Sequence, residues 1–277
     1  MLKQRVITAL ILVALLLPAL AVATPWPFAL LTLAMIGAAG WEWARLNGAA
    51  ASALLWGVLL ACACGAALWV GWHHAAPHLV WWAAMIVWVL GGALVLRGGV
   101  AGWPRVPVSA RLAIGLVLLW TAWLALSTAK SAGVNFILSI LCLVWAADIS
   151  AYFGGRAFGK RKLALAISPG KSWEGVWSGM AGALLLAAFW IWLDTQFAMD
   201  SPSIYTHLNG RFGVAGMALI VVFLCAMSVV GDLFESLVKR AAGAKDSSQL
   251  LPGHGGVLDR VDALLPVFPI ALALTTI

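Results

Sequence analysis

The sequence predicts an all-α, polytopic transmembrane helical bundle, and three observations support that fold class. Hydrophobic residues make up 64% of the 277 positions and charged residues only 10%, and the mean hydropathy is +1.01. Apolar runs close to the length that a helix needs to cross about 30 Å of hydrocarbon recur along the chain. Tryptophans such as Trp41, Trp72 and Trp82 stand near the ends of these runs, as in the aromatic belts of membrane interfaces.

Taken in order, the apolar runs predict about nine spans with a cytoplasmic N-terminus. They are expected at Val6–Val22, Pro25–Ala44, Ala51–Trp72, Leu79–Leu96, Leu112–Ser127, Val134–Phe153, Val176–Leu193, Val214–Gly231 and Leu258–Ile277. In this topology all but Lys130 and Arg211 of the 17 Lys and Arg residues lie on the cytoplasmic side, in keeping with the positive-inside rule. The first run also resembles a signal peptide, but the spans that follow favour an uncleaved first helix.

The distribution of charge and cysteine excludes some functions and divides the chain. The net charge of +7 does not indicate a nucleic-acid partner, because the basic residues lie in loops where membrane topology accounts for many of them. The four cysteines all fall within apolar runs, which argues against a disulfide framework or a zinc site. Before Asp148 the predicted spans carry almost no ionisable residues, with Glu42 beside Arg45 as the exception, whereas after it polar cytoplasmic loops alternate with the spans. We therefore expect residues 1–130 to form a transmembrane scaffold and residues 131–277 to form a transmembrane catalytic region with polar cytoplasmic loops.

A first polar stretch runs from Ala146 to Gly175. The apolar run before it is too short to cross the bilayer, so its helix must continue through Asp148 and Tyr152, which share one face at i,i+4 spacing. Glycines and basic residues then alternate as far as Lys171, a composition that suits a polyphosphate. The alternative is that the basic residues, above all the run Lys160–Lys162, only set the topology of a short loop.

A second polar stretch, V-V-G-D-L-F-E-S-L-V-K-R, leaves the eighth predicted span. Its polar residues recur at helical spacing, so one polar stripe continues from the membrane boundary into the cytosol. These residues are Asp232, Glu235, Ser236, Lys239 and Arg240. The purely structural alternative is that Asp232 pairs with Lys239 or Arg240 at a solvated helix end.

A third polar stretch, K-D-S-S-Q-L-L-P-G-H-G-G-V-L-D-R-V-D from Lys245, precedes the last apolar run. That run is too short to cross alone, so we expect a helix from Leu258 that contains Asp259 and Asp262 one turn apart. Glycines before a helix N-terminus suit an anion, and carboxylates beside a phosphate suit a divalent cation such as Mg²⁺. An ion-translocating channel also uses intramembrane acids, but it does not need this density of Lys, Arg and Gly. His254, between glycines and near acids, is a further functional candidate.

The stretch from Ser236 to Asp262 resembles the signature of the phosphatidate cytidylyltransferases, also called CDP-diacylglycerol synthases. The family pattern has Ser, Lys-Arg, Lys-Asp, His-Gly-Gly and Asp-Arg-x-Asp, and this sequence fills each of those places. Two upstream motifs, D-x-x-A-Y-x-x-G-R-x-x-G-K from Asp148 and S-P-G-K-S-W-E-G from Ser168, also resemble the family's. Ser172 stands where Thr is commoner, which retains the hydroxyl. The early spans resemble the family only in hydropathy.

The resemblance implies that CTP and phosphatidic acid react to give CDP-diacylglycerol and pyrophosphate, with Mg²⁺ and a second, monovalent cation such as K⁺ as the expected metals. The implied metal ligands are Asp232 and Asp259, with Asp148, Asp246 and Asp262 as further ligands or orienting residues. The other catalytic candidates are Lys239, Lys245 and His254. The candidates for binding the phosphates of CTP or lipid are Lys171, Ser172, Arg240, Gly255, Gly256 and Arg260. No general base is expected, because a phosphomonoester is already ionised near neutral pH.

The resemblance also implies a homodimer in the bacterial inner membrane, with the site on its cytoplasmic side. Other functions stay open at this point. Two are chemical: a CTP-dependent lipid kinase, or a cytidylyltransferase for another lipid phosphate. A third, which the motifs make less favourable, is an ion-coupled transporter that uses Asp148 and Asp232 as a proton relay.

Overall fold

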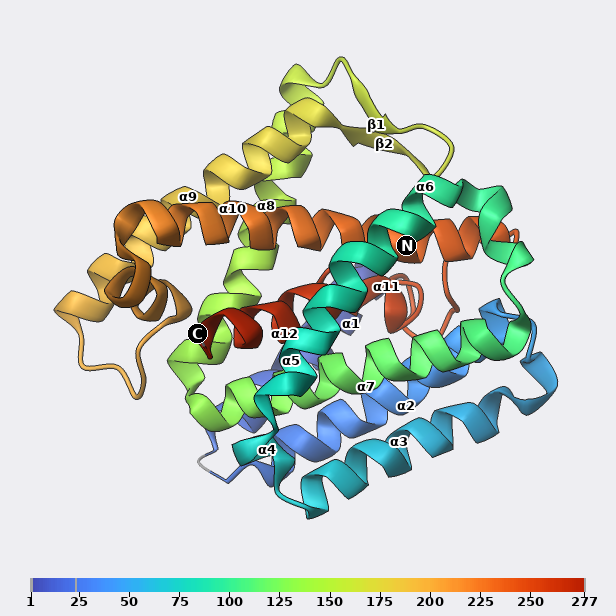
Figure 1. Ribbon diagram of the computed structural model, residues 1–277, viewed down its shortest axis with the longest axis horizontal. Helices are drawn as coiled ribbons and strands as arrows, with labels where there is room; N and C mark the ends of the chain where they lie inside the picture. Colours follow the sequence, from blue (N-terminus) through green and yellow to red (C-terminus); the bar gives the residue numbers. More distant parts are fainter. Residues whose placement is uncertain (1, 23, 277) are drawn as a thin grey trace.

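The computed structural model describes residues 2–22 and 24–276, and its regular structure is almost entirely helical (Figure 1). The helices are α1 (Leu2–Ala21), α2 (Trp26–Leu46), α3 (Ala53–Trp69), α4 (Trp72–Ala75), α5 (His78–Ile86), α6 (Gly92–Gly102), α7 (Val108–Ala132), α8 (Val134–Phe158), α9 (Trp173–Gln196), α10 (Ile204–Ala241), α11 (Leu258–Val261) and α12 (Leu264–Thr275). Short 3₁₀ or π segments adjoin them at η1 (Ala50–Ser52), η2 (Val87–Gly91) and η3 (Trp103–Arg105). The strands are β1 (Lys162–Ala164) and β2 (Ser168–Ser172).

Six helical segments in the described part of the chain are long and apolar enough to cross a membrane. They are Ala50–Trp69, His78–Arg105, Val108–Ala132, Val134–Phe158, Trp173–Gln196 and Ile204–Ala241. The fold is therefore an all-α polytopic membrane bundle, as the sequence predicts, and the protein is an integral membrane protein. The remaining predicted spans fall on α1, α2 and α12, so the full predicted count of spans stays a prediction.

A short β-hairpin, which the sequence analysis does not predict, takes the place of the expected loop between α8 and α9. Its strands β1 and β2 pair antiparallel, with Lys162 opposite Ser172. Glu174, in the first turn of α9, accepts hydrogen bonds from the backbone N–H groups of Lys160 at 3.0 Å and Arg161 at 3.1 Å. An acidic side chain is favourable in the first turn of a helix, and here it also fixes the start of the hairpin.

The last predicted span, Leu258–Ile277, is not one continuous helix. It is divided into α11 and α12, with Asp262 in the turn between them. Pro266 has no N–H to donate to the carbonyl of Asp262 four residues earlier, so the helical hydrogen bonds are interrupted there, while Asp262 and Ala263 keep helical dihedral angles. The break separates Asp259, in α11, from the apolar α12. Ile277, where the predicted span ends, lies outside the described residues.

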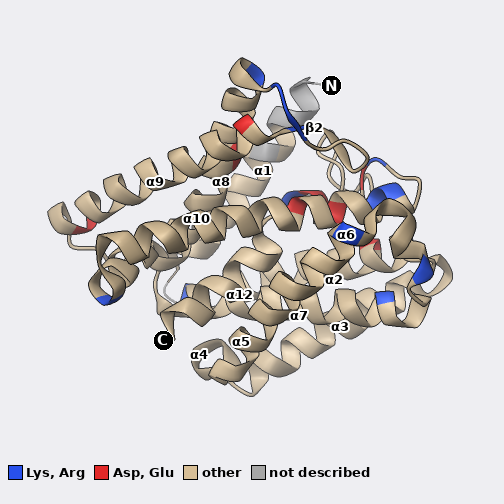
Figure 2. Cartoon of the chain, turned by 45° about the horizontal axis from the view of Figure 1, so that its top comes forward, with Lys and Arg blue, Asp and Glu red and all other residues tan. Residues whose placement is uncertain are grey.

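Helix ends that are distant in sequence meet at one end of the bundle, which we call the charged end. It comprises the C-terminus of α2, the β-hairpin, the C-terminus of α10 and α11. Trp43 of α2 donates through Nε1 to the carbonyl of Arg111 in α7 at 2.9 Å, and the Thr8 hydroxyl of α1 donates to the carbonyl of Pro252 at 2.9 Å. Figure 2 shows that most of the charged residues gather at this end of the bundle.

The opposite end of the bundle, where α8 begins, carries a separate polar cluster. Asp200 accepts a hydrogen bond from the N–H of Asn135 at 2.9 Å, and the Asn135 side chain donates to Asp194 of α9 at 2.8 Å. The Thr206 hydroxyl of α10 donates to the same Asp194 carboxylate at 2.6 Å. These bonds satisfy the free N–H groups at the start of α8 and join α8, α9 and α10. We therefore assign a structural role to this cluster.

Gly231 of α10 allows the segment around α12 to approach closely. A methyl group on Gly231 would overlap the carbonyl oxygen of Asp262 and would lie 2.8 Å from Cδ of Pro266. We expect Gly231→Ala to lower the stability of the protein by about 1–3 kcal/mol, because overpacking forces these groups apart. Thermal unfolding in detergent measures the change.

Gly210, in the part of α10 that precedes a kink at Gly213, is the control, because a methyl group there would have no atom within 4 Å. Gly210→Ala should leave the melting temperature unchanged or slightly higher, since alanine favours a helix more than glycine does. Equal melting temperatures for Gly231→Ala and Gly210→Ala would show that the close approach at Gly231 is not important.

Candidate active site

A cavity of about 770 Å³ lies at the charged end, between α8, β2, α9, α10 and α11. Its charged lining residues are Asp148, Arg156, Lys171, Asp232, Asp259, Arg260 and Asp262. The same lining includes the apolar side chains of Val144, Trp145, Val176 and Leu264. The cavity therefore brings together charged residues from all three polar stretches of the sequence.

Lys171 and Asp232 form an ion pair that joins β2 to α10. The Nζ atom of Lys171 lies 2.7 Å from Oδ2 of Asp232, and both side chains are partly exposed. The Ser236 hydroxyl, one turn later on α10, donates to Oδ1 of Asp232 at 3.4 Å. The structural alternative, in which Asp232 pairs with Lys239 or Arg240, is wrong, because the partner of Asp232 comes from the hairpin.

Asp148 and Tyr152 lie one turn apart on α8, and both line the cavity. The helix continues unbroken through them, which confirms the prediction made from the short apolar run. Arg156, a further turn along, donates to the Tyr152 hydroxyl at 3.4 Å. No hydrogen bond from the described residues contributes to the environment of the Asp148 carboxylate, so its oxygens are available to a ligand in the cavity.

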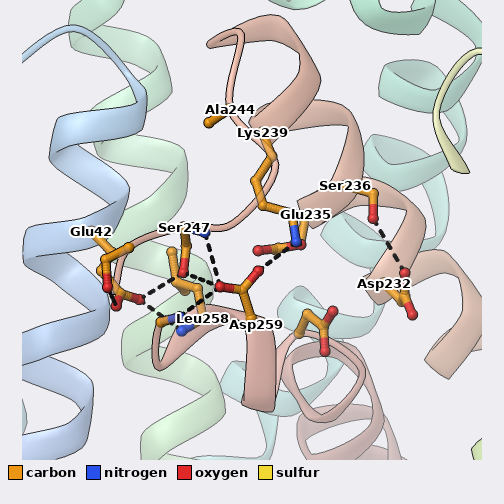
Figure 3. A network of polar contacts seen from close by, with 12 residues as sticks. Glu42, Asp232, Glu235, Ser236, Lys239, Ala244, Ser247, Leu258 and Asp259 are labelled. Carbon is orange, nitrogen blue, oxygen red and sulfur yellow. Dashed lines mark hydrogen bonds and ion pairs between the residues drawn. The ribbon is translucent and has the colours of Figure 1, made fainter. Parts of the chain in front are cut away.

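Asp259, in α11, is held by a set of hydrogen bonds (Figure 3). Its Oδ1 accepts from Nζ of Lys239 at 2.5 Å, and its Oδ2 accepts from the Ser247 N–H at 2.8 Å, the Ser247 hydroxyl at 2.7 Å and the Gly256 N–H at 2.7 Å. Burial by itself raises the pKa of this carboxyl, but the bonds from Lys239, Gly256 and Ser247 outweigh it and hold the pKa below its usual range. Asp259 is therefore ionised and fixed in orientation at neutral pH.

Lys239 connects Asp259 to a second carboxylate, that of Glu235 (Figure 3). Its Nζ lies 2.5 Å from Oε2 of Glu235 and 2.5 Å from Oδ1 of Asp259. Lys239 and Glu235 are both buried, and neither is among the described residues that line the cavity. From the sequence, Glu235 is placed only in a polar stripe. Its i,i+4 spacing from Lys239 is the signal that could have identified the pair.

Asp262 adds a further carboxylate to the cavity, and the resulting excess of acidic groups fits a cation. Mg²⁺ takes oxygen ligands, keeps several waters, and is usually held by one or two carboxylates together with substrate phosphates. Among the described residues, no group of three or more His, Cys, Asp and Glu side chains is placed to hold a metal by itself. A Mg²⁺ ion in this cavity would therefore need water and phosphate to complete its coordination.

Ser172 and Arg260, two of the candidates for phosphate binding, also lie in the lining. The Ser172 side chain caps α9 by accepting a hydrogen bond from the N–H of Gly175 at 3.2 Å. Arg260 is exposed beside Asp259. Together with Lys171, these residues place hydroxyl and cationic groups around the carboxylates.

Lys245, Asp246 and Arg240 lie outside the cavity lining, within the described part of the chain. Lys245 and Asp246 line a second hollow, of about 690 Å³, together with Arg45. The guanidinium of Arg240 donates to the carbonyl of Ala244 at 3.1 Å and so stabilises the turn that follows α10. The roles predicted for these three residues stay predictions, and the structure places the residues beside the site rather than in it.

The run His254–Gly255–Gly256 turns around two carboxylates. Gly255 has a φ of +83°, and a methyl group on it would lie 2.8 Å from Oδ2 of Asp259. A methyl group on Gly256 would overlap Oε1 of Glu42, and the Gly256 N–H donates to Asp259. The N–H donor expected from the sequence to cradle a phosphate thus serves a protein carboxylate, and a phosphate at Gly256 would have to displace that bond.

Glu42 of α2 is a residue that the sequence analysis does not include in the site. It is fully buried, and it accepts hydrogen bonds from the loop between α10 and α11 (Figure 3). Glu42 is the only acidic residue that precedes Asp148. The position of Glu42 as a single acidic residue within an apolar segment is the signal that could have identified it, because an ionisable residue in such a segment indicates a specific partner.

A model of the cytidylyltransferase family matches residues 3–277. The chain belongs to the cytidylyltransferase family. The phosphatidate cytidylyltransferase of Pseudomonas aeruginosa is 41% identical over 284 aligned residues, which cover 99% of this chain and 97% of that protein. The phosphatidate cytidylyltransferase of Haemophilus influenzae is 36% identical, with coverage of 97% and 96%. The enzyme of the same name from Bacillus subtilis is 40% identical over a shorter region, which covers 50% of this chain and 46% of that protein. The resemblance inferred from the motifs is confirmed.

Proposed function

We propose that this protein is a phosphatidate cytidylyltransferase, which transfers CMP from CTP to phosphatidic acid and releases pyrophosphate. The family match and the names of the similar proteins support this activity. The structural observation that carries the proposal is the mixed lining of the cavity, in which acidic and basic groups stand beside apolar side chains of membrane helices. The phosphates of a nucleotide need the charged groups. A phospholipid needs the charged groups for its phosphate and the apolar side chains for its acyl chains.

The cavity lies where a membrane lipid could meet a soluble nucleotide. Val144 and Trp145 belong to a membrane-spanning helix, whereas Lys171 and Arg260 lie beyond the ends of the spans. We infer that the lipid enters sideways along α8, with its acyl chains against the apolar residues and its phosphate near the basic ones. CTP enters from the aqueous side.

The proposed cofactor is Mg²⁺, for which Asp148, Asp232 and Asp262 supply carboxylate oxygens in the cavity. When bound, Mg²⁺ would neutralise charge on the triphosphate and polarise the phosphoryl group that is attacked. Asp259, an expected ligand, has its Oδ2 occupied by three donors, so it can offer Oδ1, which it shares with Lys239. A monovalent cation such as K⁺ is a second proposal for the same carboxylates.

The basic residues of the cavity are proposed to bring two anions together. An oxygen of the lipid phosphate attacks the α-phosphorus of CTP, and a new P–O bond forms as the bond to the β-phosphate oxygen breaks and pyrophosphate leaves. Arg156, Lys171 and Arg260 offset the repulsion between the anions and orient them for in-line attack. No protein base is required, because the lipid phosphate is already ionised near neutral pH.

We also propose that the charged end faces the cytoplasm and that the chain crosses the bacterial inner membrane about nine times from a cytoplasmic N-terminus. The hydrogen bond between Thr8 and Pro252 supports this orientation, because it holds the start of α1 beside the loop of the site. The gathering of charges at that end (Figure 2) is in keeping with the positive-inside rule. A homodimer is proposed from the family resemblance, and light scattering of the purified protein measures it.

Product analysis with labelled CTP tests the proposed reaction. Purified protein in detergent, given phosphatidic acid and Mg²⁺, should transfer the α-phosphate label to the lipid and release the γ-phosphate label in pyrophosphate. Label from the γ-phosphate in the lipid would indicate a lipid kinase instead. Transfer to a different lipid phosphate, with none to phosphatidic acid, would change the substrate assignment.

Removal of divalent cations should stop this reaction. We expect EDTA to abolish transfer and an excess of Mg²⁺ to restore it, because neutralising the triphosphate requires a cation. The assay has no transmembrane gradient, so turnover under these conditions argues against an ion-coupled transporter as the main activity. Full activity in EDTA would contradict the proposed cofactor.

A further inference from the structure

We propose that Glu42 of α2 is a positioning residue for Asp259, acting through the loop that joins α10 to α11. The inference rests on the proposed function, because its catalytic consequence concerns the same cavity. Glu42 belongs to the predicted scaffold rather than to the family motifs, and it is not among the described residues that line the cavity. Its influence on the reaction must therefore pass through the loop.

The carboxylate of Glu42 binds the middle of that loop and its end (Figure 3). Its Oε1 accepts hydrogen bonds from the Ser248 hydroxyl at 2.6 Å and the Val257 N–H at 2.9 Å. Its Oε2 accepts from the Leu258 N–H at 2.8 Å and lies 3.2 Å from the Ser247 hydroxyl, whose one proton it shares with Asp259. One side chain of the scaffold thus holds the middle of the loop against its end, where α11 starts.

The surroundings of Glu42 show that these bonds are its main compensation for burial. Glu42 is fully buried, and no Lys, Arg or His of the described chain forms an ion pair with it. Arg45, close by on α2, lies over the ring of Trp41 with its Cζ 4.5 Å from the ring centroid. A buried carboxylate is costly unless donors replace its lost water. The loop supplies those donors.

Two residues of the loop, Ser247 and Gly256, lie against both Glu42 and Asp259. The Ser247 hydroxyl lies 2.7 Å from Oδ2 of Asp259 and 3.2 Å from Oε2 of Glu42. Gly256 donates its N–H to Asp259 at 2.7 Å, while a methyl group on its Cα would overlap both Oε1 of Glu42 and Oγ of Ser247. The two carboxylates therefore enclose the same short segment, and the position of Glu42 sets the position of the donors that orient Asp259.

Glu42→Gln is the central variant, because it keeps the length of the side chain and replaces one acceptor oxygen by an NH₂ donor. One of the two oxygens of Glu42 then no longer accepts hydrogen bonds from the loop. We expect kcat for CMP transfer to fall about 10- to 100-fold, as for other residues that orient a catalytic carboxylate. The KM for phosphatidic acid should change little, since Glu42 does not line the cavity. Glu42→Asp, which restores the charge on a shorter side chain, should recover part of the loss.

Hydrogen–deuterium exchange of the whole protein in detergent gives a second measurement that does not depend on activity. In Glu42→Gln the backbone of residues 246–258 should exchange faster than in the wild type, while α8 and α9 should exchange as before. Asn135→Ala is the matched control, since it removes the hydrogen bonds of a buried side chain at the opposite end of the bundle. It should lower the melting temperature but leave the exchange of the loop and kcat per folded protein unchanged.

Unchanged loop exchange in Glu42→Gln, or an equal loss of kcat in Asn135→Ala, would overturn the proposal and leave Glu42 with a general structural role. Should Glu42→Gln fail to fold, Ser248→Ala keeps the test available, because it removes one donor and retains the carboxylate. It should accelerate loop exchange in the same direction, and unchanged exchange would again refute the proposal. A wild-type protein without CMP transfer would refute the proposed function instead, independently of the exchange result.

Discussion

Replacement of Asp232 by asparagine should lower CMP transfer by about 10²–10³-fold while the protein remains folded in the membrane. Asparagine keeps the shape of the side chain and can still accept from Ser236, but it removes the negative charge that pairs with Lys171 in the cavity. Because that ion pair is partly exposed, its loss should change the free energy of unfolding by about 1 kcal/mol or less. Initial rates with labelled CTP and thermal unfolding of the same preparation measure the two effects separately.

Asp200→Asn is the matched control for Asp232→Asn. It makes the same chemical change to an exposed carboxylate that caps the start of α8, at the end of the bundle away from the cavity. Asparagine keeps one acceptor oxygen for the N–H groups of Val134 and Asn135 and loses the other, so the melting temperature should fall slightly while turnover stays near wild type. Raised Mg²⁺ should rescue Asp232→Asn only in part. Near-normal turnover of Asp232→Asn at ordinary Mg²⁺ would refute the role of this carboxylate.

Replacement of Asp259 by alanine should abolish measurable turnover and also loosen the loop that carries it. The change leaves the N–H groups of Ser247 and Gly256 without their acceptor, at a cost of about 1–3 kcal/mol for each buried group that finds no other partner. Lys239 keeps Glu235 as its counter-ion. The spans themselves are untouched, so the variant should still insert and fold in membranes.

The effect on stability distinguishes Asp259 from Asp232. Asp259→Ala should clearly lower the melting temperature and speed hydrogen exchange in the loop, whereas Asp232→Asn should change the melting temperature little and leave the loop exchange unchanged. Asp259→Asn should be almost as inactive as the alanine variant, because an amide nitrogen is a donor and cannot accept the bonds that a carboxylate accepts. Turnover of Asp259→Ala close to wild type, or a melting temperature equal to that of Asp232→Asn, would contradict this account.

Helix α10 supplies polar groups to two neighbours at once, and this explains the density of charge near its end. Asp232 pairs with the hairpin through Lys171, whereas Glu235 and Lys239 are buried on the side of Asp259. The helical spacing of the sequence predicts that these residues share one stripe. It does not predict the partners from other elements, Lys171 of β2 for Asp232 and Asp259 of α11 for Lys239, because they lie far along the chain from these residues.

Much of the architecture could be predicted from hydropathy and length, because a helix in hydrocarbon must satisfy its own backbone and must be long enough to cross. The continuation of α8 through Asp148 follows from that requirement, and the structure confirms it. The interruption before α12 also has a local signal in the sequence, Pro266. The length of the apolar run, taken alone, predicted one continuous helix there. The short hairpin was missed because paired strands depend on contacts between two segments, and neither segment has a strong local signal.

The sequence by itself determined the fold class, the family and the chemical types gathered in the site, because hydropathy and the spacing of charged residues are local properties. Only the tertiary structure decided how those groups are used. It gave Asp232 a partner from the hairpin, placed the Gly256 N–H against Asp259, and brought Glu42 of α2 to the loop between α10 and α11. The physical reason is that a buried charge must find donors wherever helix packing places them, and no local pattern records which helices will be neighbours.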